Sequence, residues 1–103
     1  MGLCEVCGKR RAEHQHHRDP RGMGGDDSAL VNSPANALDL CLWCHEWIEN
    51  HRTIAYGVKW LLRTGLDPRE EPVLLASAYG QGWMLLDEHG GATWVTGMPW
   101  ALV

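Results

Sequence analysis

Four cysteines occur as two CxxC pairs, a spacing that is typical of a metal site. The pairs are Cys4–Cys7 and Cys41–Cys44. Four thiolates complete the tetrahedral shell of a structural Zn²⁺, and such a closed shell leaves no position for water. Disulfides are the alternative, but Met1 leads into the first cysteine motif without an apolar leader, which favours a reducing compartment. The spacing therefore predicts one structural zinc.

A second set of candidate ligands lies between and just after the cysteine pairs. The sequence EHQHHR stands between them, and His45 follows the last cysteine directly. On a strand, His14 and His16 would point to one face and His17 to the other, so metal binding and proton transfer could be divided between neighbours. On a helix, His45 and Glu49 share a face and could hold a divalent cation. Taken alone, each group could equally be a metal-affinity tract or an ordinary polar face.

The elements that must position these residues are short. In chain order we expect a CxxCG knuckle at 4–8, a strand at 12–18, a Gly- and Pro-rich loop at 19–34, a segment at 35–40 with Leu38 and Leu40 on one side, a helix at 42–51, a helical turn at 53–57, strands at 58–63 and 72–76, and a hairpin of 83–87 and 92–96. These elements predict an α+β fold. We expect the tryptophans to serve packing rather than binding.

Length and composition limit the class of protein. The chain has 103 residues, enough for one domain with a modest core that a metal would help to stabilise. No apolar run approaches the roughly 20 residues that cross a bilayer. We therefore expect a soluble cytoplasmic protein without a membrane partner.

Charge does not decide whether the chain binds nucleic acid. The net charge is −4, whereas nucleic-acid binders usually carry a basic surface. Residues 1–25, however, carry five Lys or Arg against three Asp or Glu, a local charge of +2. The prediction of function must therefore come from the candidate site.

Together, the cysteine and histidine motifs resemble the HNH endonucleases, also called ββα-metal nucleases, and particularly the small zinc-containing type of bacterial viruses. The matching sequences are CEVC, HHR with the RGMGG that follows, Asn36 within PAN, LCLWCH and WIENHR, which cover about residues 4–52. The resemblance implies a zinc-stapled ββα-metal core at 1–52 and a β-rich extension at 53–103. The extension would include a small C-terminal β-hairpin.

The resemblance also implies roles for individual residues. His16 matches the metal ligand that ends the first strand, and His17 matches the general base that deprotonates water. Asn36 matches the asparagine that holds the loop and orients the base. His45 matches the ligand at the start of the helix, and Glu49 stands where many members have a second helical histidine, a change that favours harder ions.

Two further assignments concern the edges of this site. Asn50 or His51 could replace Glu49 as a ligand if the helix is displaced. Arg18 and Arg21 flank the base, and their guanidinium groups are suited to grip phosphate oxygens.

The function implied is hydrolysis of DNA phosphodiester bonds by a His base and one divalent ion (Mg²⁺, Mn²⁺, Ni²⁺ or Zn²⁺), leaving 5′-phosphate and 3′-hydroxyl ends. Phage DNA-packaging proteins would be partners in the host bacterial cytoplasm, and no small-molecule cofactor is expected. The main alternative is a non-catalytic zinc-finger-like module that binds nucleic acid or protein. A toxin or restriction nuclease of the same fold is a third interpretation, and the short chain argues against a stand-alone toxin.

Overall fold

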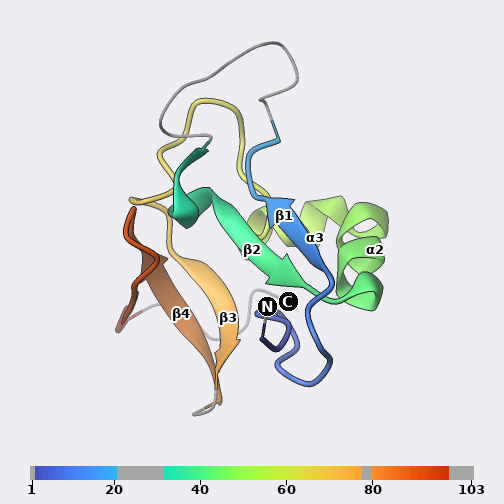
Figure 1. Ribbon diagram of the computed structural model, residues 1–103. Helices are drawn as coiled ribbons and strands as arrows, with labels where there is room; N and C mark the ends of the chain where they lie inside the picture. Colours follow the sequence, from blue (N-terminus) through green and yellow to red (C-terminus); the bar gives the residue numbers. More distant parts are fainter. Residues whose placement is uncertain (1, 21–31, 78–79, 98–103) are drawn as a thin grey trace.

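Two small sheets and two helices make up the part of the chain that the computed structural model describes, residues 2–20, 32–77 and 80–97. The elements are β1 (His14–His17), the 3-10 turn η2 (Pro34–Asn36), β2 (Ala37–Leu40), α2 (Leu42–Asn50), α3 (Arg52–Gly57), β3 (Val73–Ser77), β4 (Gly80–Leu86) and β5 (Ala92–Trp94). The predicted α+β class is confirmed. In Figure 1, both helices lie to the right of the β1–β2 pair, and β3 and β4 lie to its left.

The N-terminal half contains β1, β2 and α2 in this order, and β2 forms from the segment expected at 35–40. β1 and β2 are antiparallel, with His16 opposite Leu38 and His14 opposite Leu40. Leu38 and Leu40 are fully buried, as their shared side predicted, and Ile48 of α2 packs into the same core. This core also contains residues from beyond position 52, so the two halves of the chain are stabilised together.

The prediction of a strand at residues 58–63 is wrong. The segment is a turn, with Lys59 at a φ of 70° that extended chain does not adopt. Its polar groups bond to three other parts of the chain. The Leu61 N–H donates to the Ala55 carbonyl, the Leu62 N–H to the Arg18 carbonyl, and the Trp60 Nε1 to the Leu74 carbonyl. The apolar residues of this segment are therefore buried in a turn that connects α3, β1 and β3, whereas Arg63 is exposed.

Arg18, which directly follows β1, places a charged side chain against this turn. Its side chain is fully buried, and its guanidinium donates to the backbone carbonyls of Lys59, Ala35, Pro68 and Glu71 at 2.7–3.1 Å. Burial lowers the pKa of Arg18 to about 10, an effect that the nearby Glu71 opposes. Arg18 therefore joins four segments of the fold.

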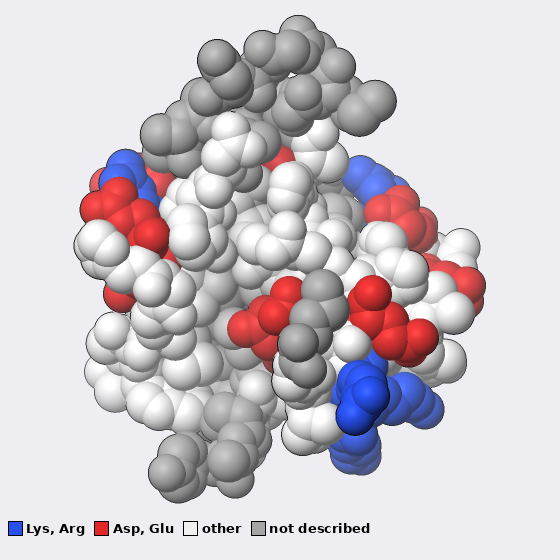
Figure 2. Space-filling view, in the orientation of Figure 1, with Lys and Arg blue, Asp and Glu red and all other residues white. Residues whose placement is uncertain are grey.

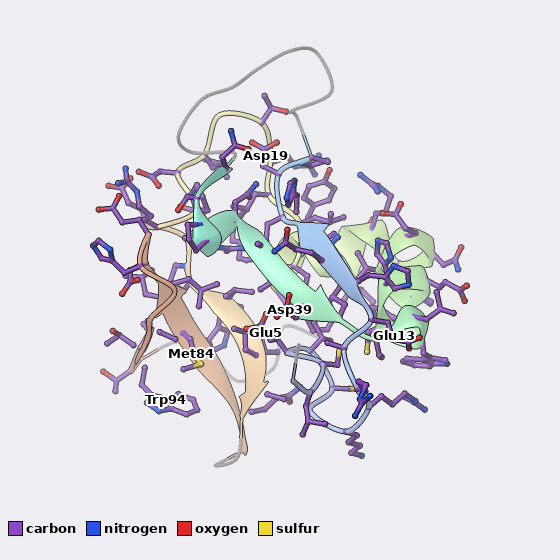
Figure 3. The ribbon with its side chains drawn as sticks, viewed as in Figure 1. Glu5, Glu13, Asp19, Asp39, Met84 and Trp94 are labelled. Carbon is purple, nitrogen blue, oxygen red and sulfur yellow. The ribbon has the colours of Figure 1, made fainter. Side chains whose placement is uncertain are left out.

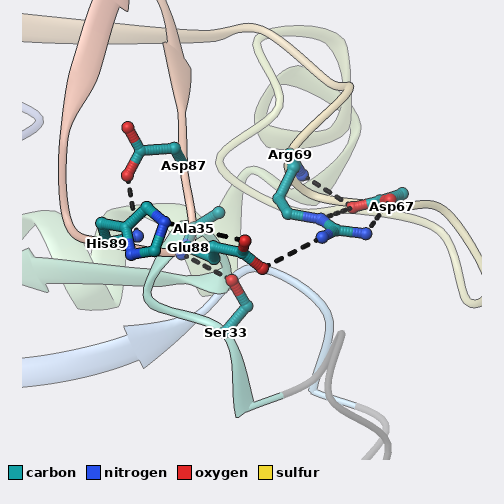
Figure 4. Close-up of polar contacts among 7 residues, drawn as sticks. All are labelled: Ser33, Ala35, Asp67, Arg69, Asp87, Glu88 and His89. Atoms are coloured by element: carbon teal, nitrogen blue, oxygen red, sulfur yellow. Dashed lines mark hydrogen bonds and ion pairs between the residues drawn. The ribbon is translucent and has the colours of Figure 1, made fainter.

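The C-terminal half is the antiparallel sheet β3–β4–β5, and the predicted hairpin of its last two strands is confirmed. At the hairpin turn, Asp87 Oδ1 accepts from the N–H groups of His89 and Gly91. Arg69 forms ion pairs with Asp67 at 2.8 Å and with Glu88 at 3.1 Å, which join the loop before β3 to the β4–β5 hairpin turn (Figure 4). No helix among the described residues is long and apolar enough to span a bilayer.

Replacing Arg18 by Ala should lower the free energy of unfolding by on the order of 3 kcal/mol, because buried carbonyls then lose their donors. Urea unfolding measures this change. The exposed Arg11 is the matched control, and Arg11→Ala should change stability by no more than about 0.5 kcal/mol. An Arg18→Ala protein of unchanged stability that had lost DNA binding would instead favour a phosphate-binding Arg18.

Candidate functional site

The four cysteines lie close together and could hold a structural metal such as zinc. Their sulfur atoms all lie within 4.8 Å of one another, and the Sγ atoms of Cys7 and Cys41 are 4.0 Å apart. A zinc–sulfur bond of about 2.3 Å gives a tetrahedron with edges of about 3.8 Å, close to this separation. Cys4, Cys41 and Cys44 are buried, while Cys7 is partly exposed.

The local backbone presents these sulfurs to one point. Cys41 is the N-cap of α2, and its Sγ accepts from the Cys44 N–H at 3.4 Å. In the first knuckle, the Gly8 N–H donates to the Cys4 carbonyl, and Gly8 has a φ of 67°. A Cβ at Gly8 would also lie 2.9 Å from the Cβ of Ala76, so the knuckle needs glycine here for conformation and for space.

The thiols have unequal acidity. Burial raises the pKa of Cys4 and of Cys44. Burial also acts on Cys7, but the backbone N–H groups of Lys9 and Arg10 outweigh it and lower the pKa of this thiol to about 6. Buried thiolates require a compensating cation, which a bound metal supplies.

The histidines of β1 and α2 meet in a cavity of about 330 Å³, lined among others by His16, His17, His45 and Glu49. The ring centroids of His16 and His45 are 5.6 Å apart, and those of His14 and His45 are 5.3 Å apart. His14 and His16 therefore face α2 together, as strand alternation predicted.

His16 is held in a single tautomer by a backbone carbonyl. It is only 6% exposed, and its Nε2 lies 2.8 Å from the carbonyl oxygen of Trp60. Because the oxygen can only accept, Nε2 is the donor, and the Nδ1 of a neutral ring is left with a free lone pair. Burial lowers the pKa of His16, and the nearby His45 lowers it further. This is the arrangement of a typical metal-binding histidine.

His17 and Asn36 lie at the exit of β1. His17 is exposed and also borders a second cavity, of about 570 Å³, with Glu5 and Asp39. Figure 3 shows these two acidic residues near the end of β2, where Glu5 Oε2 accepts from the Asp39 N–H. Asn36 is fully buried. Its Oδ1 accepts from the Asp19 N–H at 2.8 Å, and its Nδ2 donates to the Asp19 carbonyl at 3.1 Å.

Glu49 points to the histidine cavity but is paired with an arginine. Its Oε2 lies 2.9 Å from Arg52 Nη1, and both side chains are about half exposed, so the pair is weak and can exchange. Arg52 lines the same cavity. The sequence alone gave Arg52 no role, because the helix expected at 42–51 ended before it. In the structure, Arg52 begins α3 and lies three residues after Glu49.

The alternative ligands Asn50 and His51 do not line this cavity. Asn50 Nδ2 donates to the Glu46 carbonyl, and His51 stacks on Trp47 with its Nδ1 2.8 Å from the Trp47 carbonyl oxygen. Both side chains thus bond back to their own helix.

Of the two arginines predicted to grip phosphate, Arg18 lies in the described part of the chain. Arg18 is buried in the fold and turned toward backbone carbonyls, a position that does not agree with contact to DNA at the surface. Arg21 lies outside the described residues. Arg52, exposed beside Glu49, is the described arginine that borders the histidine cavity.

The two candidate metal sites are not equally formed. In the described part of the chain, the four cysteines are the one group of three or more His, Cys, Asp or Glu residues whose ligand atoms converge. His16, His45 and Glu49 share a cavity without reaching that closeness. Comparisons with family models, with curated proteins and with solved structures found no match to this chain.

We expect the purified protein to contain one zinc per chain, held by the four cysteines. Cys41→Ser should lose the metal and the cooperative thermal transition, because ligation energy is coupled to folding. Elemental analysis and circular dichroism measure both effects. His45→Ala is the control and should keep one zinc, since the cysteine site does not use it. Protein without zinc but with intact disulfides would contradict the prediction.

Proposed function

We propose that this chain is a metal-dependent DNA endonuclease of the HNH, or ββα-metal, class. The observation that carries the proposal is the approach of His16 from β1 and His45 from α2, with ring centroids 5.6 Å apart, in a cavity that His17 also lines. The order β1, β2, α2 and the cysteine cluster beside it are what the sequence resemblance leads one to expect of this class.

The proposed ligands of the divalent ion are His16, His45 and Glu49. His16 offers the Nδ1 lone pair that its bond to Trp60 leaves free. Glu49 would exchange its exposed pair with Arg52 for the ion, at little cost because such pairs are weak. When bound, a divalent ion polarises a phosphoryl oxygen and stabilises the charge of a leaving oxygen.

His17 is the proposed general base. It is exposed at the edge of the cavity, where a water molecule and a phosphodiester could approach it, and a neutral imidazole can accept the proton of the attacking water. Asn36 is the positioning residue. It holds both backbone polar groups of Asp19, two residues after His17, and so fixes the chain that leaves the base.

Arg52 takes over the phosphate-binding role that the sequence favoured for Arg18. An Arg52 released from Glu49 could donate two parallel hydrogen bonds to phosphate oxygens. Arg18 instead stabilises the backbone of the site, because its N–H donates to the carbonyl of Asn36 at 2.7 Å. The proposal keeps a structural zinc in the cysteine cluster, which does no chemistry.

A non-catalytic nucleic-acid or protein-binding module is the second candidate. It is favoured by the ligand atoms of His16, His45 and Glu49, which do not converge as the cysteine sulfurs do. Plasmid cleavage separates the two functions. DNA and phage DNA-packaging proteins enter as proposed partners through the sequence resemblance alone.

For the ion site, His16→Ala or His45→Ala should abolish plasmid cleavage while the protein keeps its cysteine-bound zinc. Glu49→Ala should shift the dependence of cleavage on Mg²⁺ or Mn²⁺ to higher concentration. Glu46→Ala removes an exposed carboxylate of the same helix that does not line the cavity, and it should leave the titration unchanged. Equal titrations for wild type and Glu49→Ala would remove Glu49 from the ligand set.

For the base, His17→Ala should lose about 10²–10⁴-fold in cleavage rate but still bind DNA and the ion.

His14→Ala is the control for the base. It removes a ring 5.3 Å from His45 but leaves the proposed base in place, so it should lose less activity than His17→Ala. An inactive His14→Ala beside an active His17→Ala would show that His14, not His17, is the working partner of His16.

A further inference from the structure

A separate cavity, the tryptophan cleft, lies on the opposite face of α2 from the proposed active site. Trp43 and Trp47 are four residues apart, as are His45 and Glu49, and the offset of two residues turns one pair about 200° from the other. The cleft has a volume of about 840 Å³, within the roughly 300–1,000 Å³ of pockets that hold small ligands. Trp60 also lines it.

Three tryptophans line the cleft, and Trp43 is the most exposed of them. Trp43 is 55% exposed, whereas Trp60 is 9% exposed and packs edge-on against Trp47, with ring centroids 5.9 Å apart. The guanidinium of Arg10 lies 5.2 Å from the centre of the Trp43 ring. Trp43 directly precedes Cys44, so a metal held by the four cysteines would fix the backbone that presents this ring. Trp60 is buried in the core, as expected of a packing residue, whereas Trp43 is largely exposed.

The charge of the cleft is opposite to that of the whole chain. Lys9 and Arg10 line it, and both are exposed. None of the described residues that line the cleft is Asp or Glu, although the chain carries a net charge of −4. Figure 2 shows Lys and Arg gathered at the lower right, over the N-terminal knuckle of Figure 1. An occupant of this cleft should therefore be anionic and should present flat rings.

We propose that the cleft binds unpaired nucleotides of single-stranded DNA, with a base stacked on Trp43 and phosphates held by Lys9 and Arg10. Single-strand sites combine basic side chains with aromatic rings in this way, because only an unpaired base exposes its face. The choice of DNA as the polymer rests on the proposed nuclease function. The cleft then gives that nuclease a preference for substrates with a single-stranded segment.

Fluorescence anisotropy of labelled oligo(dT) tests the cleft, using full-length zinc-loaded protein with His17→Ala to prevent cleavage. In this background, Trp43→Ala should weaken binding by about 5- to 150-fold, the usual range for loss of one stacked base. The control is Trp94→Ala on β5, a comparably exposed tryptophan outside the cleft, which should leave the affinity unchanged.

Salt dependence tests the phosphate contacts. Lys9→Gln combined with Arg10→Gln should make the plot of log affinity against log salt shallower by about 1.4, or about 0.7 for each lost contact. Arg63→Gln removes an exposed charge outside the cleft and should leave the slope unchanged. An equal effect of Arg63→Gln would show general electrostatic attraction and would overturn the proposal.

Other ligands and the cleavage assay complete the test. Duplex DNA bound as tightly as oligo(dT), or poly-glutamate bound in its place, would assign the cleft to another partner and overturn the proposal. Oligo(dT) binding that depends on Trp43 would support the cleft even if wild-type protein cleaved no plasmid, a result that would remove only the nuclease function. Cleavage together with binding that ignores Trp43→Ala would remove only the cleft.

Discussion

The convergence of four cysteine sulfurs is the constraint on which the rest of the fold depends. It joins the N-terminal knuckle to the start of α2, because Cys41 is both a candidate ligand and the N-cap of that helix. Fixing the start of α2 also fixes His45, one residue after Cys44, opposite β1. The same fixed helix start presents Trp43 on the other face. One site thus sets the position of both the histidine cavity and the tryptophan cleft.

A buried polar network holds the other end of β1. Arg18 donates to four carbonyls from three other segments of the chain, and Asn36 satisfies both backbone groups of Asp19. A chain of this size buries limited apolar surface, so bonds between distant segments matter more than they would in a larger domain. They hold His16 and His17 at the end of a strand of only four residues. The rigidity that the proposed chemistry needs therefore comes from buried polar contacts as well as from the core.

Local spacing predicted the parts of the structure that depend on local spacing. The CxxC pairs, the alternation of His14 and His16 on β1, the helix that carries His45 and the C-terminal hairpin all follow from residues near one another in the chain. The role of Arg18 does not, because its carbonyl partners are 17 to 53 residues away. The turn at 58–63 was missed for the same reason, since its residues bond to segments near β1, α3 and β3 and not to a neighbouring strand. The ion pair of Glu49 with Arg52 joins the end of α2 to the start of α3, so a helix expected to end at position 51 did not indicate it.

We propose that two metals have separate roles: a cysteine-bound zinc stabilises the fold, and a second ion among the histidines serves hydrolysis. The direct measurement is cleavage of supercoiled plasmid by protein that carries one zinc per chain, first without added metal and then with Mg²⁺, Mn²⁺, Ni²⁺ or Zn²⁺ supplied singly. We expect no cleavage from the one-zinc protein alone and cleavage when at least one added ion is present. Full activity without an added ion, or none with any ion, would contradict these separate roles.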